Sequence, residues 1–150
     1  MKLYTKDSKK RIIQDYILDS TKNDTIFCLG GPNISEYISL LRDKGFKTII
    51  SFEQDKDVYR LQKKQKPDCQ IINGNILDYL GYDAFYDYDF CSNIHTIEKY
   101  LPHILKTKHY SATFSLRPIS KDITIRTFKR YSEANYITYF DTSNMITFFS

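Results

Sequence analysis

Two glycines and one acidic residue in the first third of the sequence stand where they could bind a ligand. Gly30 and Gly31 follow a short apolar run, and Glu53 follows a second one. Glycine lets a ligand approach the backbone closely because it has no Cβ. A carboxylate roughly 20 residues further on can accept hydrogen bonds from both hydroxyls of a ribose. The pattern predicts a pocket for an adenosine-type ligand; the alternative is an α/β core in which Glu53 only caps a loop.

A βαβ unit would bring these residues together. The apolar runs at residues 26–29 and 48–50 are typical of strands, and apolar residues recur between them at helical spacing. A helix that begins after the glycines would point its free N–H groups at the ligand. Asn33 could instead cap this helix, with Glu36 three residues later completing a capping box. In that case Asn33 and Glu36 would serve the helix and not a ligand.

The remaining chain alternates between helix-like and strand-like segments. Further strands are predicted at residues 69–72, 84–89, 110–116, 136–140 and 145–149, the last two as a hairpin. Helices are predicted at residues 6–20, at 55–66 with Val58 and Leu61 inward, at 76–80, at 93–106 with a kink at Pro102, and at 121–132, where residues 123–125 would also suit a strand. We therefore expect one α/β domain over residues 1–150. Its mostly parallel sheet would be flanked by helices on both faces and end in a C-terminal antiparallel β-hairpin.

Composition and cysteine content narrow the class of protein. Hydrophobic residues make up 41% and aromatic residues 15% of the 150 residues, which is typical of a folded globule. No apolar run approaches the ~20 residues of a membrane span, and no apolar signal core follows Met1, so we expect a cytoplasmic protein. Cys28, Cys69 and Cys91 are expected to be buried free thiols. Cys91 and His95 alone do not make a zinc site, so no metal is expected.

Basic residues are concentrated in two parts of the sequence. The net charge is +4, with one cluster near the start and one near the end: Lys9, Lys10 and Arg11, then Arg117, Lys121, Arg126, Lys129 and Arg130. Basic faces attract the phosphates of DNA or RNA. A solvated lysine-rich surface would give the same count, so the charge alone favours nucleic acid only slightly.

From about Thr25 to the end, the motifs and their order resemble the class I S-adenosylmethionine-dependent methyltransferases. The segment CLGGPN, residues 28–33, is similar to the glycine loop under the methionine part of the cofactor, and FEQD, residues 52–55, to the ribose-binding acid. NGNIL, residues 73–77, is similar to the loop that contacts adenine, with Asn75 where an aspartate is commoner. YDYDFCSN, residues 86–93, is similar to the fourth-strand motif that faces the transferred methyl group. The closing hairpin matches the family's sixth and seventh strands.

The resemblance implies a Rossmann-like fold, a cofactor and a set of site residues. The cofactor would be S-adenosyl-L-methionine, bound in the half spanning residues 25–80 by Gly30, Gly31, Asn33, Glu53, Gln54, Asn75 and Ile76. In the substrate half, residues 81–150, Asp89 would hold the methyl-accepting group, Phe90 would stack on a base and Ser92 would orient the substrate. Asp87 could take the place given to Asp89. The chain departs from the family pattern in having no acid before Gly30 and only two glycines in the loop.

The implied function is methyl transfer to nucleic acid. Because 150 residues leave no room for a separate target-recognition domain, either a protein partner supplies recognition or the substrate is a small molecule. A catalytically inactive methyltransferase-like binding module is the main alternative. A nicotinamide-dependent oxidoreductase is a further one, although GGPNIS matches the expected GxGxxG fingerprint poorly.

Overall fold

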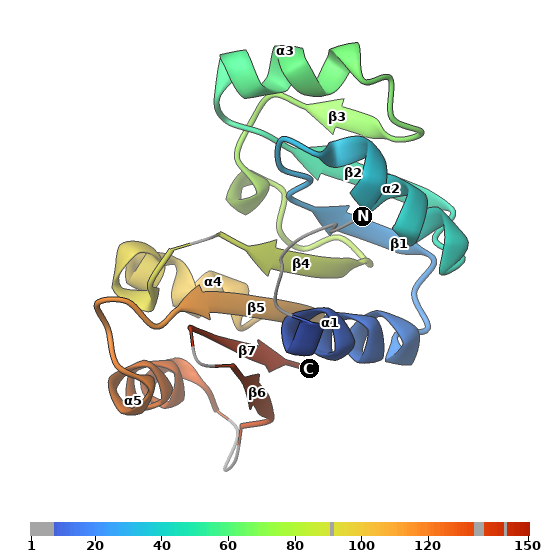
Figure 1. The fold of residues 1–150 in the computed structure, drawn as a ribbon. Helices are drawn as coiled ribbons and strands as arrows, with labels where there is room; N and C mark the ends of the chain where they lie inside the picture. Colours follow the sequence, from blue (N-terminus) through green and yellow to red (C-terminus); the bar gives the residue numbers. More distant parts are fainter. Residues whose placement is uncertain (1–7, 91, 134–136, 143) are drawn as a thin grey trace.

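A seven-stranded sheet forms the centre of the computed structural model (Figure 1), which describes residues 8–90, 92–133, 137–142 and 144–150. Its strand order is β3-β2-β1-β4-β5-β7-β6. The first five strands are parallel, and β7 lies antiparallel between β5 and β6. The strands are β1 Thr25–Cys28, β2 Thr48–Phe52, β3 Gln70–Ile72, β4 Phe85–Asp89, β5 His109–Ser115, β6 Tyr139–Asp141 and β7 Met145–Phe149. The predicted fold class is confirmed.

Helices cover both faces of the sheet. They are α1 Ser8–Ser20, α2 Ile34–Asp43, α3 Lys56–Lys64, α4 Leu101–Ile104, α5 Lys121–Tyr131 and the 3₁₀ helices η1 Ile76–Asp78 and η2 Ile94–Tyr100. Side chains of α1, α2 and α3 pack in one apolar cluster, and those of η2, α4 and α5 pack in the other. The alternative strand at residues 123–125 is wrong, because Ser120 accepts a hydrogen bond from the N–H of Ile123 and caps α5.

The predicted helix at residues 93–106 divides at its proline. Residues 94–100 form the 3₁₀ helix η2, and only Leu101–Ile104 are α-helical. Pro102 has no N–H to donate, and it is tolerated within the first turn of α4, where that N–H would have no partner in the helix. The closing hairpin is confirmed, although its first strand begins at Tyr139; residue 136 of the predicted strand lies outside the described residues.

The register of the parallel strands gathers three chain segments at one edge of the sheet. Ile26 of β1 is opposite Ile49 of β2 on one side and opposite Phe85 of β4 on the other. The loops that follow β1, β2 and β4 therefore leave the same edge. The chain crosses from β1 to β2 on one side of β1, and later from β3 to β4 on the other side. The gap between β1 and β4 is therefore the switch point of the sheet, where open α/β sheets bind ligands.

Asp87 is the one acidic residue buried in the middle of β4. Its carboxylate accepts a hydrogen bond from the Tyr37 hydroxyl of α2, on the sheet face that α1 and α2 cover. An unpaired charge at this depth would be costly, and this hydrogen bond offsets part of that cost.

Removal of the Tyr37 hydroxyl should weaken the fold. We expect Tyr37→Phe to lower the free energy of unfolding by about 1.5–3 kcal/mol, because it removes a hydrogen bond to a buried charged group. Urea denaturation followed by circular dichroism measures this change. Tyr16→Phe is the matched control, because the Tyr16 side chain is exposed. Equal stabilities of the two variants would contradict this role of Tyr37.

Candidate functional site

A hollow of about 430 Å³ lies at the carboxyl edge of the sheet, at the ends of β1, β2 and β4. Its volume is within the range of about 300–1,000 Å³ that is usual for small-molecule sites. It is lined by nearly all the residues that the sequence singled out, namely Gly30, Gly31, Asn33, Glu53, Gln54, Asn75, Ile76, Asp89 and Phe90. The structure thus brings the glycine turn, the acid and the fourth-strand motif to one place.

Gly30 has a packing role in addition to its predicted place beside a ligand. A Cβ at this position would lie 2.6 Å from Cγ1 of Ile34 and 2.9 Å from Oγ of Ser51, and its N–H donates to the same Ser51 hydroxyl at 2.9 Å. The missing side chain therefore leaves room for packing between α2 and β2. Gly30 also lines the hollow, so its predicted place beside a ligand stays a prediction next to this packing role.

Gly31 fits the predicted role better. Its φ is +69°, a conformation that favours glycine, and a Cβ built on it would meet nothing within 4 Å. The backbone at Gly31 therefore borders open space within the hollow, where a bound group could lie against it.

The two glycines should respond differently to alanine. We expect Gly30→Ala to lower the free energy of unfolding by about 1–3 kcal/mol through overpacking against Ile34 and Ser51. Gly31→Ala should cost about 1–2 kcal/mol through backbone strain alone. Combining Gly30→Ala with Ile34→Val relieves the clash in part, so thermal unfolding of the double variant should show a cost below the sum of the two single costs. Additive costs would contradict the packing role of Gly30.

Asn33 lies at the start of α2 without capping it. Its side chain makes no capping hydrogen bond to the helix, so the capping-box alternative is wrong and the side chain lines the hollow. One N–H of the first turn of α2 is already used, because Ser35 donates to Oε1 of Gln65 at 3.2 Å. The helix start therefore offers the hollow fewer free donors than the sequence pattern suggested.

Glu53 is held firmly at the end of β2. Its N–H donates to the carbonyl of Ile72 at 3.0 Å, and its carbonyl accepts from Gly74 N–H at 3.0 Å and Nδ2 of Asn73 at 2.8 Å. One carboxylate oxygen, Oε2, accepts from the N–H of Asp55 at 3.0 Å. The carboxylate thus steadies its own loop, as the alternative interpretation held, and it also lines the hollow.

Asn75 and Ile76 form the wall beyond β3. Oδ1 of Asn75 accepts from the N–H of Leu77 at 3.0 Å and caps η1, so this oxygen is engaged within the chain. The Ile76 side chain is buried in the core and closes the hollow from below. Together they give one apolar surface with an amide beside it.

Asp89 and Phe90 end the fourth strand at the rim of the hollow. Of the two acids between which the sequence left the choice open, Asp89 lines the hollow, whereas Asp87 is bonded to Tyr37 in the interior. The ring of Phe90 stacks on Tyr88 with 5.8 Å between centroids and 19° between planes. The aromatic side chain at the rim is therefore supported from behind by a buried ring.

Ser92 does not line the hollow. Its carbonyl oxygen accepts from the N–H of Ser115 at 2.9 Å and joins this loop to β5. Cys91 lies outside the described residues, and within the described ranges no three His, Cys, Asp or Glu side chains gather as a metal site. Burial raises the pKa of Cys28 well above its usual value and that of Cys69 to about 11, so both thiols stay protonated at neutral pH.

The sequence pattern gave no sign of two functional glutamines, Gln62 in α3 and Gln65 as its C-cap. The helix was expected to turn Val58 and Leu61 inward, but Leu61 is 54% exposed and Gln62 is fully buried. Nε2 of Gln62 donates to the carbonyl of Gly31 at 2.8 Å, and Nε2 of Gln65 donates to the carbonyl of Pro32 at 2.6 Å. These bonds accompany the orientation of α3, in which Gln62 and not Leu61 faces the interior. An apolar pattern could not indicate them.

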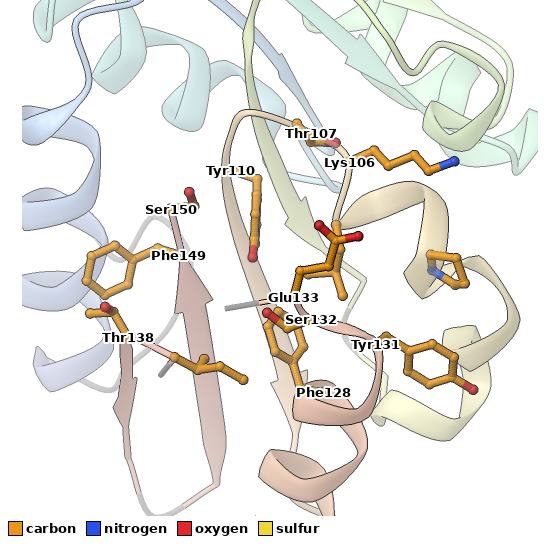
Figure 2. A pocket seen from close by; sticks show the side chains of 13 residues that line it. Lys106, Thr107, Tyr110, Phe128, Tyr131, Ser132, Glu133, Thr138, Phe149 and Ser150 are labelled. Atoms are coloured by element: carbon orange, nitrogen blue, oxygen red, sulfur yellow. The ribbon is translucent and has the colours of Figure 1, made fainter. Parts of the chain in front are cut away.

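A second hollow, of about 790 Å³, lies at the amino end of β5 (Figure 2). Tyr110 and Phe128 line it, with Phe149 of the last strand and the following Ser150 on the other side. Parallel α/β sheets bind ligands at the carboxyl ends of their strands. The hollow at the ends of β1, β2 and β4 is therefore the better candidate site, although its volume is smaller.

Comparison of the fold with solved structures gives clear likenesses. A SAM-dependent methyltransferase from Mesorhizobium loti matches with a TM-score of 0.64 and 7% identity over 95% of this chain and 97% of that one. A Streptococcus mutans protein assigned to the SAM-dependent methyltransferases matches with a TM-score of 0.64 and 13% identity over 93% of this chain, but only 47% of its own length is covered. The 16S rRNA methylase RmtB matches with a TM-score of 0.53 and 7% identity over 95% of this chain and 61% of that one.

The chain has the Rossmann-like fold of the class I methyltransferases. At sequence identities of 7–13%, these likenesses show a shared fold only. No family model matches the sequence, and comparison with curated proteins gives no match. Among the described residues, none of the helices of this methyltransferase fold is long and apolar enough to cross a membrane.

Proposed function

We propose that this protein is an S-adenosylmethionine-dependent methyltransferase that acts on nucleic acid. The observation that carries the proposal is the single hollow at the switch point, lined by Gly31, Glu53 and the Asp89–Phe90 pair. Three loops that are distant in the sequence supply a bare backbone turn, a sugar-binding acid and an acid beside an aromatic ring. These are the parts that a methyl donor containing adenosine and a flat acceptor would need.

The residues present fit this cofactor. Glu53 would bind the ribose, because one of its carboxylate oxygens is held by Asp55 and the other is left to accept hydroxyls. Asn75 and Ile76 would border the adenine, and the open space at Gly31 would admit the amino-acid part. When bound, S-adenosylmethionine supplies a methyl group made electrophilic by its sulfonium.

Asp89 and Phe90 would act on the acceptor. A carboxylate at the rim can accept a hydrogen bond from an acceptor N–H or O–H and stabilise the positive charge that develops there. The ring of Phe90, backed by Tyr88, can stack on an extruded base. Positioning of the acceptor is the main contribution that we assign to these two residues.

Surface charge supports a nucleic-acid substrate. In the second basic cluster, Arg117, Arg126 and Lys129 are exposed, whereas Lys121 pairs with Asp141 at 3.2 Å and Arg130 with Glu98 at 3.7 Å. The side chains of the first cluster lie outside what the structure describes. One protein of similar fold is named as an rRNA methylase. A protein partner would supply target recognition if the chain itself does not.

The alternative is a binding module without catalysis. The position before Gly30 holds Leu29 and not the acid of the family pattern, which removes one contact to the cofactor. In that case the protein would bind nucleic acid through its basic residues and bind no methyl donor.

Calorimetric titration separates these functions. We expect saturable binding of S-adenosylmethionine and S-adenosylhomocysteine and no binding of NAD. Binding of NAD alone would support an oxidoreductase, and binding of RNA without either adenosyl ligand would support the inactive module. Salt titration of RNA binding would then report how many phosphates the protein contacts.

A further inference from the structure

Side chains from the end of α3 donate hydrogen bonds to the glycine turn, residues 30–32. Gln62 is fully buried and donates from Nε2 to the carbonyl of Gly31 at 2.8 Å. Gln65, at the end of the helix, donates from Nε2 to the carbonyl of Pro32 at 2.6 Å and accepts from the N–H of Ser35 at 3.2 Å. Two consecutive carbonyls of the turn and the first turn of α2 are therefore all bonded to one helix.

The Gln62 amide is costly for the core. Its Oε1 is buried, and within the described part of the chain it has no hydrogen-bond partner. An unsatisfied buried amide oxygen destabilises a fold, so an apolar residue of similar size would suit this position better if packing were its only task. The contact that the amide does make is the one to Gly31, at the wall of the hollow.

The same helix begins shortly after the acid of the site. Asp55 caps α3 by accepting from the N–H groups of Asp57 and Val58, and the N–H of Asp55 donates to the Glu53 carboxylate. Helix α3 therefore follows Glu53 by one short loop and ends at the two glutamines. Besides the pairing of β1 with β2, this helix is a second link between the glycine turn and the acid.

We propose that Gln62 and Gln65 are positioning residues of the cofactor pocket, acting through the carbonyls of Gly31 and Pro32. The inference rests on the proposed function and extends it to the way in which the chain shapes a turn that has only two glycines. Their bonds keep the Gly31 backbone turned to the space where the amino-acid part of the cofactor would lie. The adenosine part, bound at Glu53, does not need them.

If the two glutamines shape only the amino-acid part of the pocket, their replacement should change ligand selectivity. We compare S-adenosylhomocysteine, which would span both regions, with adenosine, which would contact only the Glu53 region. Gln62→Leu and Gln65→Ala should each weaken S-adenosylhomocysteine binding by about tenfold, the equivalent of one hydrogen bond, and leave adenosine binding unchanged. Gln70→Ala on β3 is the control, because Gln70 is exposed and does not line the hollow.

Calorimetry and thermal unfolding distinguish the outcomes. The melting temperature of Gln62→Leu should stay close to that of the parent, because the buried unpaired oxygen is lost together with the bond. Equal losses for both ligands with a lower melting temperature, or unchanged affinity for both, would overturn the positioning role. Gln65→Ala keeps the test valid if Gln62→Leu does not fold, because Gln65 is exposed. If the parent protein binds neither ligand, the proposed function fails, and this inference fails with it.

Discussion

Replacement of Glu53 by alanine should lower the affinity for S-adenosylhomocysteine by at least about 100-fold while the protein stays folded. The carboxylate would accept both ribose hydroxyls, and hydrogen bonds to a charged group contribute about 1.5–3 kcal/mol each. Two such bonds give about 3 kcal/mol or more, which corresponds to about 100-fold in the dissociation constant. Calorimetry measures the affinity, and circular dichroism measures the fold.

The control for this experiment is Asp57→Ala. Asp57 is exposed in the first turn of α3, next to the Glu53 loop, and it is not among the residues that line the hollow. The Asp57→Ala substitution removes one negative charge close to Glu53, so it controls for the long-range electrostatic effect of losing a charge. An affinity of Glu53→Ala equal to that of Asp57→Ala would reject the ribose assignment.

The second large effect is expected at Asp89. We predict that Asp89→Ala lowers the rate of methyl transfer to RNA or DNA by about 10²–10⁴-fold, the usual contribution of a positioned acid or base. S-adenosylhomocysteine affinity should change little, because the carboxylate would contact the acceptor and not the cofactor. The rate is measured as incorporation of labelled methyl groups, and the affinity by calorimetry.

Asp83→Ala is the matched control for Asp89. Asp83 lies in an exposed position in the loop before β4, away from the lining of the candidate site. It should transfer methyl groups at the parental rate. A rate for Asp89→Ala within a few-fold of that control would show that the acid at the rim does not position the acceptor.

The features predicted best from the sequence were those fixed by local pattern. Alternating apolar strands and helices predicted a mostly parallel sheet, and the βαβ pattern predicted that the glycine turn and Glu53 would meet. The resemblance to the methyltransferases, and not the pattern, placed the fourth-strand motif beside them. The structure places Gly31, Glu53 and Asp89 at one edge of the sheet. Strand order and register, which the sequence pattern left open, complete the arrangement.

Features that depend on long-range contacts could not be predicted. Strand alternation places Asp87 and Asp89 on the same face, and only the packing of α2 against β4 shows that Asp87 is bonded to Tyr37. The packing role of Gly30 depends on Ile34 and on Ser51, which lies in the next strand. Gln62 and Gly31 are 31 residues apart, so no local pattern links them.

A crystal structure of the protein with S-adenosylhomocysteine would show directly where the cofactor binds. We expect the ligand in the hollow at the ends of β1, β2 and β4, with its ribose hydroxyls on the Glu53 carboxylate and its amino-acid part against Gly31. Density for the ligand in the larger hollow beside Tyr110, or a ribose more than hydrogen-bond distance from Glu53, would contradict this expectation.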